Sequence, residues 1–163
     1  MGRKQKGFSL IELLIVVVVI LVIAAIAIPN LMRSRMAANE ASAVASLRSI
    51  NTSQVVYQNS YGSGFATKLA DLSDGGAAGN CVPSVTPTAS ASCLIDAALA
   101  GGTKSGYGFL YTPVSTGATV SSYSVNADPT TPGSTGQRHF FADQTNLIRV
   151  NQTAAATNSD PAF

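Results

Sequence analysis

Lys6-Gly7-Phe8-Ser9-Leu10-Ile11-Glu12 is the stretch around which the rest of the chain is organised. A short basic leader, residues 1–6, precedes it, and an almost unbroken apolar run over residues 13–28 follows it. Counted from Phe8 the apolar segment has about 21 residues, and a helix needs roughly 20 to cross a bilayer. Because a helix satisfies its own backbone hydrogen bonds in lipid, the run predicts a membrane-spanning helix.

The charges before the apolar run predict how it is inserted. Arg3, Lys4 and Lys6 all lie in the leader, and cations that flank a membrane helix stay preferentially on the cytoplasmic side. We therefore expect a cytoplasmic leader, with the C-terminal part of the chain on the other side of the membrane.

Glu12 is the one charged residue in the predicted membrane helix. A carboxylate there costs about 2.5–3.5 kcal/mol at the bilayer centre and less near the helix end, so it marks a functional candidate that needs a cationic partner. Lys6 lies beyond a glycine. Cleavage after Gly7 would create a closer cation, the α-amino group of Phe8, on this chain or on a neighbour.

At these residues the chain resembles the type IV pilin family, which includes the pseudopilins of type II secretion. Its members carry a short basic leader that ends in Gly, then Phe, three mostly apolar or small residues and Glu, here Gly7, Phe8 and Glu12. The resemblance is close from Lys6 to about Asn51. It implies that a prepilin peptidase cleaves after Gly7, which removes residues 1–7 as a leader peptide, and N-methylates the Phe8 amine. It also implies that Glu12 pairs with the Phe8 amine of an adjacent subunit during assembly.

The resemblance further implies a structural, non-enzymatic role as a type IV pilus subunit, in adhesion, twitching motility or DNA uptake. The prepilin would sit in the inner membrane, in contact with lipid, with its leader cytoplasmic and its C-terminal domain periplasmic. An inner-membrane assembly platform would then add it to a homo-oligomeric helical filament outside the cell. The alternative within the family is a type II secretion pseudopilin, which forms a short periplasmic pseudopilus.

Other classes of protein share parts of this pattern. A plain signal anchor has a basic leader and an apolar run, and Ala24-Ala25-Ile26-Ala27 imitates a signal-peptide cleavage site. A membrane-anchored periplasmic enzyme or binding domain would also keep its N-terminus. The coincidence of basic leader, Gly-Phe junction, lone acid and uninterrupted apolar run favours the pilin interpretation.

Composition supports an anchor followed by one small domain in 163 residues. The formal charge is +2, but without Arg3, Lys4 and Lys6 the chain has seven cations against eight anions. The remainder therefore has no basic excess that would point to nucleic acid, and a DNA partner finds no support in the composition.

Cys81 and Cys93 are the only cysteines. An even pair outside the membrane predicts one disulfide that closes a small loop. The rival interpretation is a metal or redox pair, but the spacing is too wide for Cys-x-x-Cys and no histidine is near.

Motifs for catalysis or for cofactor binding are absent from the sequence. There is no nucleophile motif, no phosphate loop and no metal-spaced cluster, so we expect no cofactor, no metal and no enzymatic activity. The single histidine, His139, is expected to be a surface or packing residue of a strand.

The pattern after the apolar run predicts that the helix continues. Pro29 predicts a kink between a hydrophobic part, residues 8–30, and an amphipathic part, residues 31–61. Spacings of three and four residues predict one buried seam along the second part. Five polar residues fall mainly off this seam and can face water or neighbouring subunits, namely Ser46, Arg48, Ser49, Asn51 and Thr52. The seam consists of Ala43, Leu47, Ile50, Gln54, Tyr57 and Tyr61.

The rest of the chain predicts a small sheet. Residues 62–105, which include both cysteines, are expected to form a variable loop region with short helical pieces at 67–72 and 94–100. Residues 106–152 are expected to form an antiparallel sheet, and residues 153–163 a polar tail without a clear order signal. The strands are predicted at 106–112, 121–127, 138–142 and 146–150. Because such a sheet needs a cover, the fold class is α+β, with the helix seam laid across the sheet.

Two departures from the family pattern concern the subfamily. Major pseudopilins are associated with a calcium loop near the C-terminus, and no convincing acidic ligand set can be assembled here. Many pilins close a C-terminal loop with a disulfide, whereas Cys81 and Cys93 precede the predicted strands.

Overall fold

The structure is a computed structural model that describes residues 7–76, 81–82 and 86–163. It divides into two compact units, Met1–Arg35 and Met36–Phe163. The long helix α1 (Leu10–Tyr61) contributes to both of them. A long helix was predicted from Phe8 to about Tyr61, and α1 begins two residues later.

In the first unit, α1 continues through Pro29. Because proline has no N–H, the helical hydrogen bond to the Ala25 carbonyl is missing. One residue later, the side-chain amide of Asn30 donates to the Ile26 carbonyl at 3.2 Å. The structure thus establishes that the helix passes the proline, and the kink there stays a prediction.

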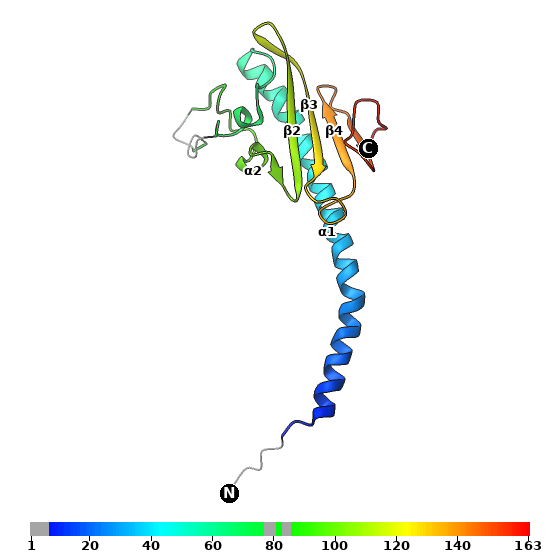
Figure 1. Ribbon diagram of the computed structural model, residues 1–163. Helices are drawn as coiled ribbons and strands as arrows, with labels where there is room; N and C mark the ends of the chain where they lie inside the picture. Colours follow the sequence, from blue (N-terminus) through cyan, green and yellow to red (C-terminus); the bar gives the residue numbers. More distant parts are fainter. Residues whose placement is uncertain (1–6, 77–80, 83–85) are drawn as a thin grey trace. The chain divides into compact units, whose positions relative to one another are not determined.

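The second unit is built on an antiparallel sheet in which strands that follow one another in sequence are also neighbours in space. Figure 1 shows the C-terminal half of α1 crossing one face of β2, β3 and β4. The α+β fold class predicted from the sequence is confirmed. The strands are β1 (Thr103–Lys104), β2 (Tyr107–Thr116), β3 (Thr119–Pro129), β4 (His139–Asp143) and β5 (Ile148–Asn151).

The core lies between α1 and the inner face of the sheet. Five of the six predicted seam residues are buried, and Tyr61 packs against the cluster from its margin. Alternate residues of each strand face them, as a period of two requires. The largest buried contributions from the sheet are Tyr107, Phe109, Tyr123, Val125 and Phe140.

Two polar residues that were expected to face water are buried instead. Ser46 is 4% exposed and Asn51 is 4% exposed. The Tyr123 hydroxyl donates to Oδ1 of Asn51 at 3.0 Å, so the amide satisfies a buried phenol that would otherwise lack a partner. The prediction was wrong for Ser46 and Asn51, whereas Arg48, Ser49 and Thr52 are exposed as expected. For Asn51 the reason is that Tyr123 of β3 reaches beyond the seam to bond to it.

β2 and β3 extend further than predicted, beyond Thr112, and meet in a tight hairpin. Thr116 pairs with Thr119, which leaves a two-residue turn whose first residue, Gly117, has φ 67. Turns of this kind require positive φ there and favour glycine. Pro113 lies inside β2, which pairs with β1 only near its start, and prolines are accepted on such edge strands.

The region between α1 and the sheet contains the short helices η1 (Leu69–Leu72) and α2 (Ala97–Ala100). Cys81 and Cys93 are joined in a disulfide, as predicted. The backbone around Cys93 is also tied to η1. The Cys93 N–H donates to the Ser73 carbonyl at 3.0 Å, and the Leu94 N–H donates to the Leu72 carbonyl at 2.7 Å.

Removing the disulfide by Cys81→Ser with Cys93→Ser should lower stability without changing the fold. The backbone bonds to η1 remain, whereas the cross-link across 12 positions is lost, which is worth about 3 kcal/mol in the chain-entropy estimate. Thermal unfolding of the full chain in detergent, followed by circular dichroism, measures the change. Wild-type protein treated with a reductant should have the same melting temperature as the double variant. The same melting temperature for the oxidised wild type, the reduced wild type and the variant would refute the prediction.

The C-terminal tail is ordered against β5, although no clear order signal was found in residues 153–163. The Val150 N–H donates to the Pro161 carbonyl at 3.0 Å, and the Phe163 N–H donates to the Ile148 carbonyl at 2.9 Å. The Phe163 ring meets the Phe140 ring edge-on at 5.5 Å. The tail therefore covers a sheet edge that would otherwise present unpaired backbone groups.

Candidate functional site

The Gly7–Phe8 bond lies in an exposed segment before the start of α1. Neither residue belongs to a helix or strand, and Phe8 is 86% exposed. A Cβ atom built on Gly7 would meet no other atom within 4 Å. Nothing among the described residues therefore requires glycine at position 7, and we expect any requirement for it to come from a partner that binds the segment.

Ser9 and Glu12 form a helix cap directly behind this bond. The Ser9 N–H donates to Oε2 of Glu12 at 2.9 Å, and the Leu13 N–H donates to the Ser9 carbonyl at 3.3 Å. This is the reciprocal half of a capping box, in which an acid at the third helical position binds the N–H of the cap residue. The positive end of the helix dipole also favours a carboxylate here.

The cap holds the Glu12 carboxylate at the end of α1 that faces the Gly7–Phe8 bond. Within the described part of the chain, the second carboxylate oxygen of Glu12 has no hydrogen-bond partner. It can accept a bond from an ammonium group. Gly7 and Phe8 thus directly precede the cap that holds Glu12, while Pro29 lies further along α1 and the disulfide lies in the second unit.

Ser9 was not singled out from the sequence, although its signal was present. Ser-x-x-Glu before an apolar run is the sequence pattern of a capping box, and Ser9 and Glu12 have this spacing. In the structure the bond to Glu12 comes from the backbone N–H of Ser9, and among the described residues the Ser9 hydroxyl has no hydrogen-bond partner.

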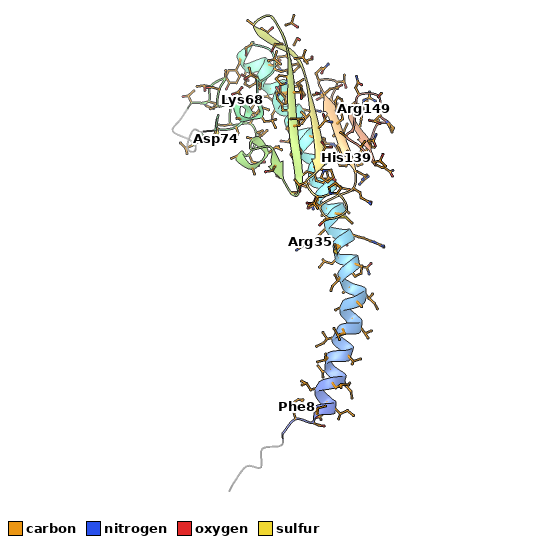
Figure 2. The ribbon with its side chains drawn as sticks, in the orientation of Figure 1. Phe8, Arg35, Lys68, Asp74, His139 and Arg149 are labelled. Atoms are coloured by element: carbon orange, nitrogen blue, oxygen red, sulfur yellow. A yellow bond between two sulfur atoms is a disulfide. The ribbon has the colours of Figure 1, made fainter. Side chains whose placement is uncertain are left out.

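The surface of α1 behind Glu12 is apolar on all sides. Every large hydrophobic side chain from Leu10 to Ile23 is at least 48% exposed within the chain. Figure 2 shows side chains projecting from both sides of the helix between Phe8 and Arg35. Among the described residues, α1 is the one helix whose length and composition would allow it to cross a membrane. After Glu12 the next charged residue is Arg33.

The second unit contains a buried charge cluster that the sequence analysis did not predict. Glu40 of α1 is 7% exposed. Its Oε1 accepts the N–H groups of Gln137 and Arg138 at 2.9 and 3.2 Å, and its Oε2 accepts the Arg138 side chain at 2.7 Å. The Arg138 guanidinium also lies 5.2 Å from the Phe163 ring centre. The cluster joins α1, the β3–β4 connection and the C-terminal tail.

This environment keeps Glu40 ionised. Burial alone would raise its pKa, but the two backbone N–H groups and the Arg138 guanidinium together hold the pKa of Glu40 below its usual range. The carboxylate is thus paired and fully hydrogen-bonded, as a buried charge must be.

His139 contacts one carboxylate and belongs to no recognisable catalytic group among the described residues. Its Nδ1 lies 2.6 Å from Oδ1 of Asp128 on the neighbouring strand. In the part of the chain that the structure describes, no hydroxyl or thiol is bonded to this pair. Nor do three or more His, Cys, Asp or Glu residues among those described gather in a way that could hold a metal ion.

Comparison with known proteins finds one family profile and one curated relative that match this chain. A family profile described as the prokaryotic N-terminal methylation motif matches residues 2–28. The type IV wide pilus major component PilA4 of Thermus thermophilus is 42% identical over 71 residues, which are 42% of this chain and 54% of that protein. The chain thus spans about half the length of the curated relative it matches. No solved structure matches the chain.

Proposed function

We propose that this chain, a member of the type IV pilin family, is a structural subunit of a type IV pilus, made as a membrane-inserted prepilin and polymerised after processing. The observation that carries the proposal is the arrangement at the start of α1. An exposed Gly7–Phe8 bond directly precedes the helix cap that holds Glu12, and an apolar helix surface that is exposed within the chain begins there.

The apolar surface supports insertion and then assembly. Side chains this exposed and this apolar need lipid or other apolar helices around them, because water around them is unfavourable. In the membrane, lipid covers them, with the basic leader held on the cytoplasmic side. In a filament, the same surfaces of neighbouring subunits cover one another, and lipid contacts are exchanged for helix contacts.

Processing supplies the partner that Glu12 needs. Cleavage after Gly7 leaves a new amine on Phe8, which N-methylation keeps basic. The second carboxylate oxygen of Glu12 then accepts a hydrogen bond from the Phe8 ammonium group of an adjacent subunit. Because both charges would otherwise be buried alone in apolar surroundings, pairing them favours one register between subunits and disfavours others. The partners in this scheme are the prepilin peptidase, the inner-membrane assembly platform and further copies of the chain.

Gly7→Phe should block processing without affecting insertion. The segment has room for a side chain at position 7, so the substitution disturbs nothing within the chain and acts through recognition by the peptidase. On an immunoblot against the C-terminal domain, the wild type should run as the shorter processed form and Gly7→Phe as the longer precursor.

Gly2→Phe provides the matched control. It places the same side chain in the leader at a distance from the scissile bond, and it should be processed as the wild type is. Cleavage of Gly7→Phe to the wild-type extent would argue against peptidase recognition at this bond.

The location of the assembled polymer distinguishes a pilus subunit from a pseudopilus subunit. A pilus subunit is recovered in filaments sheared from the cell surface, whereas a pseudopilus subunit stays in the cell envelope. We place the chain in a surface pilus, and the shear fraction tests this directly.

A further inference from the structure

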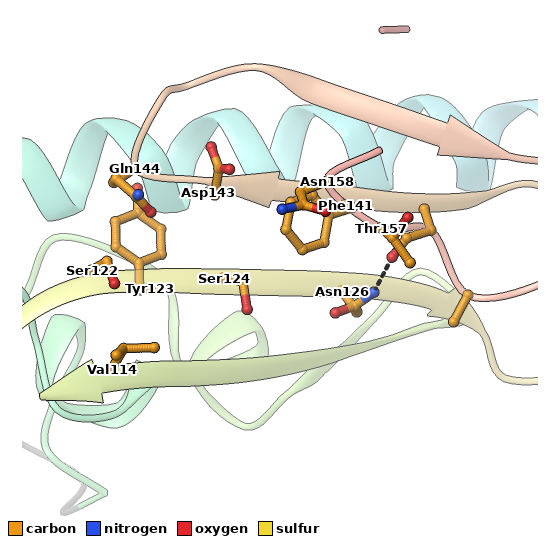
Figure 3. Close-up of a pocket in the computed structure, with 12 residues that line it drawn as sticks. Val114, Ser122, Tyr123, Ser124, Asn126, Phe141, Asp143, Gln144, Thr157 and Asn158 are labelled. Atoms are coloured by element: carbon orange, nitrogen blue, oxygen red, sulfur yellow. Dashed lines mark hydrogen bonds between the residues drawn. The ribbon is translucent and has the colours of Figure 1, made fainter. Parts of the chain in front are cut away.

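A groove lies on the outer face of the sheet, the face opposite α1. Its volume is about 490 Å³, which is within the range of small-molecule sites. Figure 3 shows Ser122, Ser124 and Asn126 along β3, with Phe141 and Asp143 along β4. Segment 155–158 of the C-terminal tail forms one wall.

The strand register forms the floor of the groove. Ser124 pairs with Asp143, and Asn126 pairs with Phe141. Paired side chains on one face of a sheet have Cβ atoms about 4.5–5.5 Å apart, so the aromatic ring stands directly beside polar groups. The floor thus combines one apolar surface with hydrogen-bonding side chains at fixed spacing.

The wall is held in place by hydrogen bonds. The Asn126 side-chain amide donates to the Ala156 carbonyl at 2.7 Å. Asp160 closes the turn that follows, since its Oδ2 accepts the Thr157 N–H at 2.7 Å and its Oδ1 accepts the Asn151 side chain at 2.9 Å. The groove is therefore present in the chain before any ligand arrives.

Several polar groups in the groove are left for a ligand. Among the residues that the structure describes, the side chains of Ser122, Ser124, Gln144 and Asn158 have no hydrogen-bond partner. Hydroxyls and amides both donate and accept. They match a ligand whose own groups both donate and accept, which is the property of a hydroxyl-rich molecule.

The lining argues against other ligand classes. It contains no Lys, Arg or His, so it offers nothing to neutralise phosphate groups or nucleic acid. From Ser124 to Ala127, β3 is already paired with β4, so a peptide cannot add to the sheet between them along that stretch.

We propose that this groove binds a neutral saccharide. The apolar face of a sugar ring would lie on Phe141, and its hydroxyls would bond to the serines, Gln144 and Asn158 around that ring. This inference does not depend on pilus assembly, and it assigns to the C-terminal unit a recognition role that would be displayed on any surface where the chain is exposed.

Saturation-transfer NMR on the full chain tests the proposal, with maltose, cellobiose and lactose as separate probes. The detergent must be zwitterionic, because detergents with sugar headgroups would compete for the groove. At least one disaccharide should receive saturation from the protein, while glucose 6-phosphate and triglycine amide should not. No transfer to any of the three disaccharides, or stronger transfer to either control compound, would overturn the proposal.

Variants locate the binding. Gln144→Ala with Asn158→Ala removes two exposed amides from the groove, and transfer should fall at least about threefold, as expected for the loss of one or two hydrogen bonds. Gln58→Ala with Asn59→Ala removes the same two side-chain types from the exposed surface of α1 and should leave transfer unchanged. Phe141→Leu should also reduce transfer, with circular dichroism confirming its fold. Equal transfer in the groove variants and the control would refute binding at this site.

Discussion

Glu12→Ala should abolish filament formation while leaving membrane insertion and Gly7–Phe8 cleavage intact. Insertion should be slightly easier, because the carboxylate costs up to about 2.5–3.5 kcal/mol in the membrane. Assembly should fail because the Phe8 ammonium of a neighbouring subunit would be buried among apolar helices without a counter-charge. Removing one partner of a buried pair costs about 3–5 kcal/mol, and every subunit in the filament would incur that cost.

The measurement is the amount of protein in sheared filaments relative to the membrane fraction, together with the size of the processed chain. Glu12→Gln separates two roles of the side chain. Its amide oxygen can still accept the Ser9 N–H that Glu12 now binds at 2.9 Å, but it carries no charge. We expect Glu12→Gln to be processed and to fail in assembly as Glu12→Ala does. Wild-type filament yield from Glu12→Gln would show that charge pairing is not required.

The second large effect is expected at Glu40, in the folded C-terminal unit. Glu40→Ala would leave the Arg138 guanidinium and the N–H groups of Gln137 and Arg138 without their acceptor. We expect a loss of about 3–5 kcal/mol in the free energy of unfolding. Denaturation of the full chain in detergent, followed by circular dichroism of the tyrosines, measures it.

Asp96→Ala is the matched control for this prediction. Asp96 also pairs with a cation, Lys104, at 2.7 Å, but the Asp96 side chain is 49% exposed. An exposed pair contributes about 0–1 kcal/mol, although Asp96 also caps α2 through the Leu99 N–H, which adds about 0.5–2 kcal/mol. A Glu40→Ala loss no greater than that of Asp96→Ala would contradict the role assigned to the buried cluster.

Glu40 should also make stability depend on pH in the acid range. Its pKa is lower in the folded chain than the ordinary value of 4.5, so the unfolded chain binds the proton more readily. The contribution of Glu40 is therefore complete above the ordinary pKa and is lost as the pH falls through the lower, folded value. Between pH 7 and pH 3, the stability difference between wild type and Glu40→Gln should shrink, and a constant difference would count against this linkage.

Local patterns were sufficient to predict the helix and the sheet. The apolar run and the three-and-four spacing from Ala43 to Tyr57 define α1, and the period of two at Tyr107, Phe109 and Tyr111 defines the start of β2. The helix and the strand can both be predicted from which of their faces is apolar, and the order of apolar and polar residues nearby in the sequence determines that face. The Ser9–Glu12 cap could also be predicted from a local sequence pattern, because the two residues are three positions apart.

Contacts between distant residues could not be predicted in this way. Glu40 stands one helical turn before Ala43 and so falls on the buried seam, but its partner is 98 positions away. Taken alone, a glutamate in a helix reads as a solvent-exposed residue. The order of the C-terminal tail has the same origin, because it depends on the β5 edge and the Phe140 ring rather than on any pattern within residues 153–163.

The most direct measurement is mass spectrometry of the N-terminal peptide of native protein recovered from a sheared cell-surface fraction. We predict a peptide that begins at N-methylated Phe8, because the exposed Gly7–Phe8 bond is the proposed processing site and the new amine is the proposed partner of Glu12. A peptide that begins at Met1 or Gly2, or one that begins after Ala27, with the protein confined to the membrane, would mean that the segment is a signal anchor or signal peptide and not an assembly motif.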